Sequence, residues 1–477
     1  MEYCVVVEPH GHTLHLPQGA VLLQELRKAG FSVDAPCGGH GTCGKCRLTV
    51  DGREVWTCQY RVCSDITVSL PVTACKTEPE LQKQKTVMGT RYAAFDIGTT
   101  TVVCFLLDEN GTVLAQRSMH NPQKGYGADV ISRIQWAIKG ERETLTLAIR
   151  KGMEQLLLDC CADAGVSVQS VVRVAAVGNP CMQQLFLGME VGNLASIPFA
   201  PMITEAKEVP AKEYFPCCPE AQLTVVPDIS GYVGADMLAC VLSEKLYEAE
   251  DTVLLVDIGT NGEMVLCHGG RMVACSTAAG PALEGANISC GMRAAPGAID
   301  HVTLDGYSVI GGGEATGICG SGLIDCVAVM LKKRILNGRG RVLTANHSYY
   351  LTDSVTITQE DIRQLQMAKG AICAGILMLT EYFGISVDEI DCCLLAGAFG
   401  TYLDAENACR IGLLPSALAG KTRAVGNRAG EGAKLLALDP GQLALCQMLT
   451  EKIGFLELAN APGFQRCFAK CTRFPED

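Results

Sequence analysis

The sequence lacks three features that would point to a membrane, secreted or nucleic-acid-binding protein. No apolar run reaches the roughly 18 residues needed to cross a bilayer, and residues 2–8 alternate like a strand where a secretory leader would be apolar. Lysine and arginine (39) are outnumbered by aspartate and glutamate (51), which gives a net charge of −12, and we expect no basic patch of the kind that a phosphate backbone favours. We therefore expect a cytoplasmic protein that binds neither membranes nor nucleic acids.

Cysteine, in contrast, is plentiful. The chain has 26 cysteines and no secretion signal, so we expect free thiols in a reducing compartment that sees little oxygen. Most should be buried fillers, as in the adjacent pairs at 160–161, 217–218 and 392–393. No serine–histidine–acid or cysteine–histidine nucleophile set can be defined from the sequence.

One glycine-rich segment, CGGHGTCGKC, carries three cysteines, and a fourth follows a short strand. The four thiolates of Cys37, Cys43, Cys46 and Cys58 predict a [2Fe-2S] cluster. Glycines suit such a loop because it needs positive φ angles and backbone N–H groups close to the sulfides. The spacing departs from the plant-type pattern, so Cys63 is the alternative fourth ligand. A structural four-cysteine zinc site is the alternative for the whole group.

The length of 477 residues exceeds what one core usually holds. The first 72 residues predict a small β-grasp-like domain, the [2Fe-2S] ferredoxin-like domain, because alternating strands, a helical stretch and an Asp-Gly hairpin turn follow one another. Its expected elements are strands at 3–8 and 12–17, a helix at 20–29, a turn at 51–52 and a final strand at 66–70. Residues 73–90 are polar and aperiodic, and they predict a linker.

An internal repeat follows and indicates two similar α/β halves, at residues 91–250 and 251–477. In each half an apolar strand ends in DIGT, first as Asp96-Ile97-Gly98-Thr99-Thr100 and later as Asp257-Ile258-Gly259-Thr260-Asn261. Such a turn places backbone N–H groups and a hydroxyl where phosphate binds. The carboxylate can position Mg²⁺ or an attacking water, and two facing copies can hold a triphosphate from both sides.

The paired motif resembles the phosphate loops of the superfamily of actin, the sugar kinases and the large heat-shock chaperones. This resemblance implies an α/β fold in which the β-grasp ferredoxin domain precedes a duplicated ribonuclease H-like, actin-like ATPase domain. It also expects a small-residue turn near the adenosine, which LLAGAFG at 394–400 fits. A glycine-rich loop at 311–322 precedes an amphipathic helix, and we expect nucleotide contact there because helix N-termini attract anions.

These motifs define the candidate site residues. Asp96 and Asp257 are expected to hold the metal and its waters, and Glu263 is a candidate for positioning the attacking water. The residues expected to bind the nucleotide are Gly98, Thr99, Thr100, Gly259, Thr260, Asn261, Gly320, Ser321, Gly397, Ala398 and Gly400.

A ferredoxin domain tethered to this fold is a rare pairing, and nearly the whole chain resembles the ATP-dependent reductive activators of corrinoid proteins. Further matching segments are VVPDISGYVGAD (225–236), CSTAAGPALEGANISCGM (275–292), AVGNRAGEGAKLLAL (424–438) and ELANAPGFQRCF (457–468). The resemblance implies an ATP-hydrolysing iron-sulfur reductase that converts a partner's inactive Co(II) corrinoid to Co(I) for methyl transfer. Its cofactors would be a [2Fe-2S] cluster, ATP and Mg²⁺.

The same resemblance implies the partners. They are a corrinoid protein of a methyltransferase system and an upstream electron donor, and a homodimer is a possible assembly. This chain is shorter between its ferredoxin and nucleotide domains than the long form of the family, so functions of the missing parts do not carry over.

Three other functions fit parts of the sequence. An ATP-driven electron injector for a dehydratase or another low-potential reductase would carry its cluster cysteines inside the nucleotide domain, whereas here they lie outside it. A small-molecule kinase with a ferredoxin appendage would transfer phosphoryl groups whatever its redox state. A nucleotide-gated docking module would bind its partner without transferring an electron.

Two smaller clusters of metal-ligand residue types are expected to be structural. The histidines at 10, 12 and 15 alternate along a predicted exposed strand, and Cys467 and Cys471 lie one helical turn apart near the C-terminal end.

Overall fold

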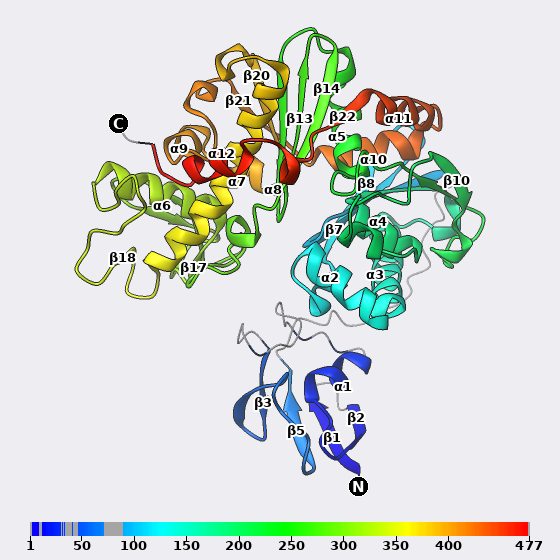
Figure 1. Ribbon diagram of the computed structural model, residues 1–477. Helices are drawn as coiled ribbons and strands as arrows, with labels where there is room; N and C mark the ends of the chain where they lie inside the picture. The colour runs from blue at the N-terminus through cyan, green and yellow to red at the C-terminus, as the bar shows by residue number, and fades with distance from the viewer. Residues whose placement is uncertain are drawn as a thin grey trace.

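The computed structural model describes residues 2–8, 12–29, 31, 33, 41, 46–70 and 89–475. Most of the predicted linker and the cysteines at 37 and 43 lie outside the described residues. The described chain forms a small N-terminal body and two larger α/β halves, which follow one another along the sequence (Figure 1). None of the described helices combines the length and the apolar character needed to cross a bilayer.

The N-terminal body confirms the expected β-grasp sheet. Its strand order is β2-β1-β5-β3-β4, with β1 and β5 parallel and α1 burying Leu22, Leu23 and Leu26. Its elements are β1 (Glu2–Glu8), β2 (His12–Pro17), α1 (Leu22–Lys28), β3 (Arg47–Val50), β4 (Arg53–Trp56) and β5 (Ile66–Ser69). Asp51 and Gly52 both have positive φ angles (46° and 78°), as the tight hairpin turn between β3 and β4 requires.

The first half contains a six-stranded sheet in the order β10-β11-β9-β6-β7-β8. Its strands are β6 (Arg91–Ile97), β7 (Thr101–Leu107), β8 (Val113–His120), β9 (Val171–Gly178), β10 (Lys207–Pro210) and β11 (Gln222–Val225). Its helices are α2 (Val130–Trp136), α3 (Arg142–Ala164), α4 (Pro180–Leu187) and α5 (Ala235–Ser243). Both faces of the sheet are covered, because α3 packs against Phe95 on one face while α5 packs in the core with Ala94 on the other.

The second half repeats this arrangement in the order β21-β20-β12-β13-β14-β22. Its main strands are β12 (Val253–Ile258), β13 (Gly262–His268), β14 (Arg271–Thr277), β20 (Cys392–Ala396), β21 (Thr422–Gly426) and β22 (Ile453–Phe455). In both halves the DIGT strand pairs antiparallel with the next strand and parallel with a later one, β9 or β20. The duplication expected from the sequence is therefore present in the topology.

The second half carries most of the helices and several short strands. The helices are α6 (Gly320–Lys332), α7 (Gln359–Phe383), α8 (Gly397–Tyr402), α9 (Ala405–Arg410), α10 (Arg428–Leu438), α11 (Gly441–Lys452) and α12 (Phe464–Cys471). The short strands are β15 (Ala298–Val302), β16 (Tyr307–Val309), β17 (Gly317–Ile318), β18 (Ser348–Tyr350) and β19 (Thr356–Thr358).

A shared core joins the two halves. Helices α5 and α10 pack on each other between the sheets, in one buried cluster with Phe105 of β7 and Leu255 of β12. A Cβ atom at Gly432 would lie 2.2 Å from the carbonyl oxygen of Ala239, so the crossing of the helices requires glycine there. This packing holds the ends of β6 and β12, where the DIGT loops begin, on the same cavity.

Candidate functional site

A cavity of about 350 Å³ lies between the halves and is lined by both DIGT loops. It brings together most of the predicted site residues. Those that line it are Asp96, Gly98, Thr99, Thr100, Asp257, Gly259, Thr260, Asn261, Glu263, Gly320, Ser321 and Gly397. Gly400 does not line it and packs against Leu395, and the side chain of Ala398 lies outside the described part of the structure.

Gly397 has a specific reason to be glycine. Parallel pairing of β12 with β20 places Asp257 beside Ala396, at the start of α8. Gly397 has a φ of 83°, and a Cβ atom there would lie 2.4 Å from Asp257 Oδ1. The first turn of α8 can therefore approach the carboxylate only without a side chain.

Ser321 is placed differently from a simple phosphate ligand. It is buried at the first turn of α6, and its hydroxyl donates a hydrogen bond to the carbonyl oxygen of Asp300 at 2.9 Å. Its backbone N–H remains part of the helix N-terminus that lines the cavity.

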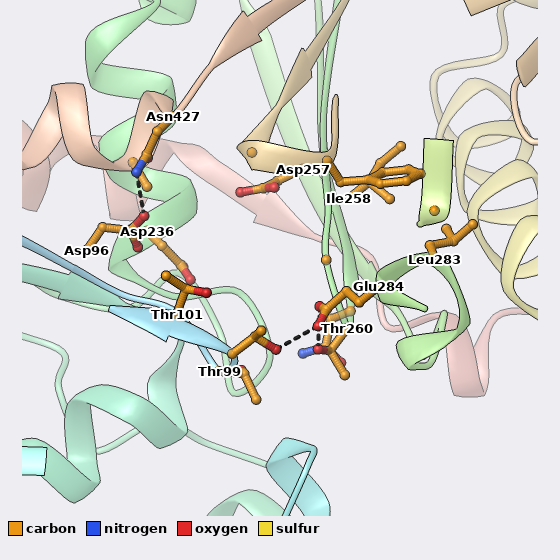
Figure 2. A pocket seen from close by; sticks show the side chains of 18 of the residues that line it. Asp96, Thr99, Thr101, Asp236, Asp257, Ile258, Thr260, Leu283, Glu284 and Asn427 are labelled. Carbon is orange, nitrogen blue, oxygen red and sulfur yellow. Dashed lines mark hydrogen bonds between the residues drawn. The ribbon is translucent and has the colours of Figure 1, made fainter. Parts of the chain in front are cut away.

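Carboxyl groups from both halves meet in the cavity (Figure 2). Burial raises the pKa of Asp96 to about 6, although the Asn427 amide, which donates to Asp96 Oδ2 at 2.8 Å, opposes the rise. Burial, with the charge of Asp96, raises the pKa of Asp257 to about 7. Asp236, at the start of α5, is raised by burial to a pKa of about 7, and burial also raises the pKa of Glu263.

Among the described residues no three acidic, histidine or cysteine side chains come together closely enough to ligate one metal ion, so the cavity carboxyl groups fit a divalent cation that is held largely through its waters. Several carboxyl groups share one desolvated space, where each raises the pKa of another, and a bound cation would stabilise their ionised forms. Behind them the buried Asp228 accepts a hydrogen bond from Gln183 at 2.8 Å through Oδ1, while its Oδ2 has no hydrogen-bond partner among the described residues. Oxygen ligands of this kind are those that Mg²⁺ prefers.

One carboxylate joins the two DIGT loops. The Thr100 hydroxyl donates to Glu284 Oε2 at 2.6 Å, and the Thr260 hydroxyl donates to Glu284 Oε1 at 2.8 Å. Figure 2 shows Glu284 between the two loops. An anionic group therefore already lies between the hydroxyls predicted to receive phosphate.

The first DIGT loop is held from behind by three buried side chains. Arg133 is fully buried and donates to the carbonyl oxygen of Thr99. Asn121 Nδ2 donates to the carbonyl oxygen of Gly98 at 2.9 Å, and Asn179 Nδ2 donates to Thr99 Oγ1 at 3.0 Å. Burial lowers the pKa of Arg133 to about 10, which leaves the guanidinium charged at neutral pH.

The motif-based prediction missed Asp236, Glu284, Asn427 and Arg133. Asp236, Glu284 and Asn427 fall inside the matching segments noted above, but nothing in the sequence pairs them with a DIGT loop. Arg133 belongs to no motif in the sequence, and its burial in α2 becomes evident only in the structure.

The described part of the cluster segment places two cysteines at one end of the β3–β4 hairpin. The N–H and hydroxyl of Thr57 donate to the carbonyl oxygen of Cys46 at 3.0 and 2.9 Å, and Cys58 follows Thr57 directly. Cys46 and Cys58 are 1% and 8% exposed, whereas Cys63 is exposed. Gln59 Nε2 lies 3.9 Å from Cys58 Sγ, as a donor to a cluster-bound thiolate would.

The positions of Cys46 and Cys58 fit a cluster, and they favour Cys58 over Cys63 as the fourth ligand. The set of four ligands stays a prediction, because Cys37 and Cys43 lie outside the described residues.

The N-terminal body also contacts the support of the first loop. The Arg27 guanidinium lies 5.5 Å from the ring centre of Tyr126, in the 3-10 helix η1 (Pro122–Tyr126). Asn121, which caps η1 by accepting the N–H of Gln123, is the residue that holds Gly98.

Family models match the chain in three consecutive parts. They are the 2Fe-2S iron-sulfur cluster binding domain at residues 5–80, the RACo middle region at 92–249 and the C-terminal domain of RACo, the ASKHA domain, at 251–477. The first implies a [2Fe-2S] cluster, and the ASKHA domain, an actin-like ATPase fold, implies ATP and Mg²⁺. The fold expected from the sequence is thus confirmed.

Two characterised relatives cover most of the chain. The corrinoid activation enzyme RamQ of Eubacterium limosum is 33% identical over 433 residues, which are 84% of this chain and 72% of RamQ. A Co(II) methylated amine-specific corrinoid protein reductase of Methanosarcina barkeri is 30% identical over 391 residues, which are 73% of this chain and 70% of the reductase.

A solved structure agrees with these relatives. The reductive activator for corrinoid, iron-sulfur protein superposes with a TM-score of 0.74 at 26% identity, over 100% of this chain and 99% of that one. With its 2Fe-2S domain, RACo middle region and ASKHA domain in order, the chain belongs to the RACo family of corrinoid-protein activators.

Proposed function

We propose that this protein is an ATP-dependent reductase that reactivates a corrinoid protein by delivering one electron, which converts inactive Co(II) to Co(I) for methyl transfer. The observation that carries this proposal is the presence, in one chain, of a 2Fe-2S domain and a cavity lined by two DIGT loops. The names of the relatives, a corrinoid activation enzyme and a corrinoid protein reductase, agree with it.

The redox chemistry explains why a nucleotide is needed. A ferredoxin-type cluster near about −400 mV is too weak a reductant for a more negative Co(II)/Co(I) couple. For one electron, each ~59 mV uphill corresponds to about 1.4 kcal/mol, so a gap of a few such steps lies within reach of ATP turnover. When bound, the cluster supplies the electron and the nucleotide supplies the free energy.

The residues of the cavity have separate roles in binding the metal, the attacking water and the phosphates. Asp96 and Asp257 hold the metal and its waters, and Glu263 positions the attacking water. The loop hydroxyls and backbone N–H groups of both halves receive the phosphates, which take the place of the Glu284 carboxylate. Both halves then contact the same phosphates. A conformation in which the two halves lie closer together therefore binds the nucleotide more tightly than one in which they lie further apart, as a nucleotide-driven change requires.

The cluster domain has its own part in the proposal. Cys37, Cys43, Cys46 and Cys58 hold the cluster in a domain over residues 1–72, and residues 73–90 tether it to ATPase halves at 91–250 and 251–477. The polar composition of the tether lets the cluster domain alternate between η1 and the bound partner.

An upstream electron donor re-reduces the cluster, and the protein acts in the cytoplasm as a homodimer. Light scattering tests the dimer.

The decisive experiment mixes the reduced protein with a Co(II) corrinoid protein and records corrinoid spectra with and without Mg-ATP. We expect Co(I) to accumulate only with Mg-ATP. Equal yields in the two samples would contradict the coupling of ATP to electron transfer.

A pair of cysteine variants tests the source of the electron. Cys46→Ser is expected to abolish Co(I) formation while partner binding and ATP binding persist. The matched control Cys63→Ser should keep the wild-type cluster spectrum and rate, and loss of the cluster in this control would make Cys63 the ligand instead of Cys58.

A further inference from the structure

A second cavity lies on the second half, where the loop after α6 meets the start of α7. It has a volume of about 450 Å³ and is lined by three arginines, Arg339, Arg341 and Arg363, and by no carboxylate of the described residues. It shares no lining residue with the cavity between the halves. Helix α6, with 13 residues, begins at the first cavity and ends before the second, so roughly 20 Å of helix separates them.

The loop that carries two of these arginines is fixed by hydrogen bonds. Asn337 Oδ1 accepts the N–H groups of Arg339 at 3.1 Å and of Arg341 at 2.9 Å. Gly340, between them, has a φ of 80°, and Gln359 Nε2 donates to its carbonyl oxygen at 2.6 Å. The loop backbone is therefore set before any ligand arrives.

Helix α7 completes this support. Gln366 Nε2 donates to the carbonyl oxygen of Arg339 at 3.4 Å, and Arg363 lies on the same helix one turn after Gln359. The backbone position of Arg363 is thus fixed relative to the loop.

The three arginine side chains at this cavity are exposed and form no ion pair within the part of the chain that the structure describes. Within the described residues, the side chains of Arg339, Arg341 and Arg363 make no ion pair and no hydrogen bond. Like charges held close together repel each other, and an anion bound among them would reverse the sign of that interaction.

We propose that this cavity binds a small phosphate-bearing anion, at a site separate from the nucleotide site between the halves. The planar, forked guanidinium group matches phosphate oxygens with paired hydrogen bonds. A fixed loop lowers the entropy lost on binding. The cavity is concave and falls within the about 300–1,000 Å³ of small-molecule sites, which favours a small ligand over a flat protein surface.

Isothermal titration calorimetry of the full-length protein with inorganic pyrophosphate tests the proposal. The nucleotide site is first saturated with Mg²⁺ and a non-hydrolysable ATP analogue, so that pyrophosphate reports on the second cavity. The test variant is Arg339→Gln/Arg341→Gln/Arg363→Gln. The matched control is Lys332→Gln/Lys333→Gln/Arg334→Gln, which removes the same charge from exposed residues just before the loop.

We expect saturable binding to the wild-type chain and to the control, and at least about tenfold weaker binding to the test variant, because each guanidinium–phosphate contact is a charge-assisted hydrogen bond. Absence of saturable binding to the wild-type chain, or equal affinity in the two triple variants, would overturn the proposal. It would also be wrong if the test variant lost affinity for the corrinoid partner while pyrophosphate bound to neither chain. Co(I) formation is scored separately, so failure of this site leaves the reductase proposal standing.

Discussion

The two DIGT loops share a motif but differ in what supports them. The first is backed by side chains from elsewhere in its half, including the fully buried Arg133, which donates to Thr99 O. The second is held mainly by its own surroundings, with the Gly259 N–H bonded to Asn261 O at 3.0 Å and the Thr277 hydroxyl bonded to Gly262 O at 3.2 Å. The first loop is also the one whose support contacts the N-terminal body. The supports of the first loop therefore extend to a helix that contacts the N-terminal body, whereas the hydrogen bonds described for the second loop stay within the second half.

Removing a supporting side chain behind each loop should give the largest difference in stability between the two loops. We expect Arg133→Met to lower the free energy of unfolding by about 3 kcal/mol, because buried acceptors lose a charged donor. Thr277→Val removes one hydroxyl bond behind the second loop and should cost about 1 kcal/mol. Urea denaturation of both variants at one pH measures the difference, and equal losses would remove the distinction between the loops.

Replacing either loop aspartate should lower the rate of ATP hydrolysis by the same factor, but the two replacements should change the stability of the fold by different amounts. Asp96→Asn and Asp257→Asn are each expected to lower Mg²⁺-dependent ATP hydrolysis about 100-fold, because a charge that positions the metal is lost. At pH 8, Asp257→Asn should raise stability by removing a desolvated charge, and Asp96→Asn should raise it less, because Asn427 loses a charged acceptor. Asp251→Asn, on the surface before β12, is the control. A smaller catalytic loss at one aspartate would indicate that only the other holds the metal.

The same carboxyl groups predict how Mg²⁺ binding depends on pH. The pKa values of Asp96 and Asp257 are raised to about 6 and about 7, and the metal binds the ionised forms. Mg²⁺ affinity should therefore fall by up to about tenfold per pH unit between pH 7 and 6, where Asp257 is protonated, and by up to about 100-fold per unit below pH 6, where Asp96 is protonated as well, with proton uptake when the metal leaves. Calorimetry in two buffers of different ionisation enthalpy measures the protons, and a pH-independent affinity between pH 5.5 and 7.5 would contradict the assignment.

In the absence of metal, the stability of the fold should rise as the pH falls, whereas the Mg²⁺ affinity falls. Because the folded-state pKa values lie above the usual carboxyl range, the folded state binds more protons than the unfolded state between about pH 4 and 7. This contribution to stability is present at low pH and is lost as the pH rises through about 7. Thermal unfolding in the presence of a chelator follows it.

The variant Glu284→Gln tests whether the two loops bind one anion together. We expect about fivefold tighter Mg-ATP binding, because a neutral amide accepts more weakly from Thr100 and Thr260 and does not repel phosphate. Glu314→Gln, an exposed change in the nearby glycine-rich loop, should leave affinity unchanged. Weaker binding by Glu284→Gln would instead make Glu284 part of the metal site.

The smallest expected effect concerns the contact between the redox domain and the first loop. Arg27→Gln removes a cation–π contact with Tyr126 that is worth about 0.5–1 kcal/mol. Hydrogen exchange at η1 should become faster, whereas Arg47→Gln, which loses a similar contact to Trp56 within the N-terminal body, should leave η1 unchanged. Identical exchange rates at η1 in the two variants would show that the N-terminal body does not stabilise the support of the first loop.

The sequence predicted the parts of the site that are local in the chain. DIGT motifs, the β3–β4 turn and the LLAGAFG segment each combine a strand end with a tight turn, so their chemistry is contained in a few adjacent residues. The missed contacts join distant residues, such as Asn427 with Asp96 across 331 positions and Glu284 with Thr100 across 184. Only the packing of the two halves brings these residues together.

Charge was misleading for a similar reason. The chain is acidic overall, yet residues 332–341 contain five basic residues, and two of them, Arg339 and Arg341, line one cavity with Arg363 of α7. A net charge summed over 477 residues describes the whole surface and does not describe a single cavity.

Helix α10 belongs to the second half in sequence but packs on the sheet of the first, and Asn427 at its start holds Asp96. The two halves consequently cannot separate as free bodies without exposing this shared core. A change in the angle between the halves that keeps this core buried has to leave the α5–α10 packing and the Asn427–Asp96 hydrogen bond in place. The residues on either side of the cavity are therefore joined on one side by buried packing, and only the side away from α5 and α10 is free to open.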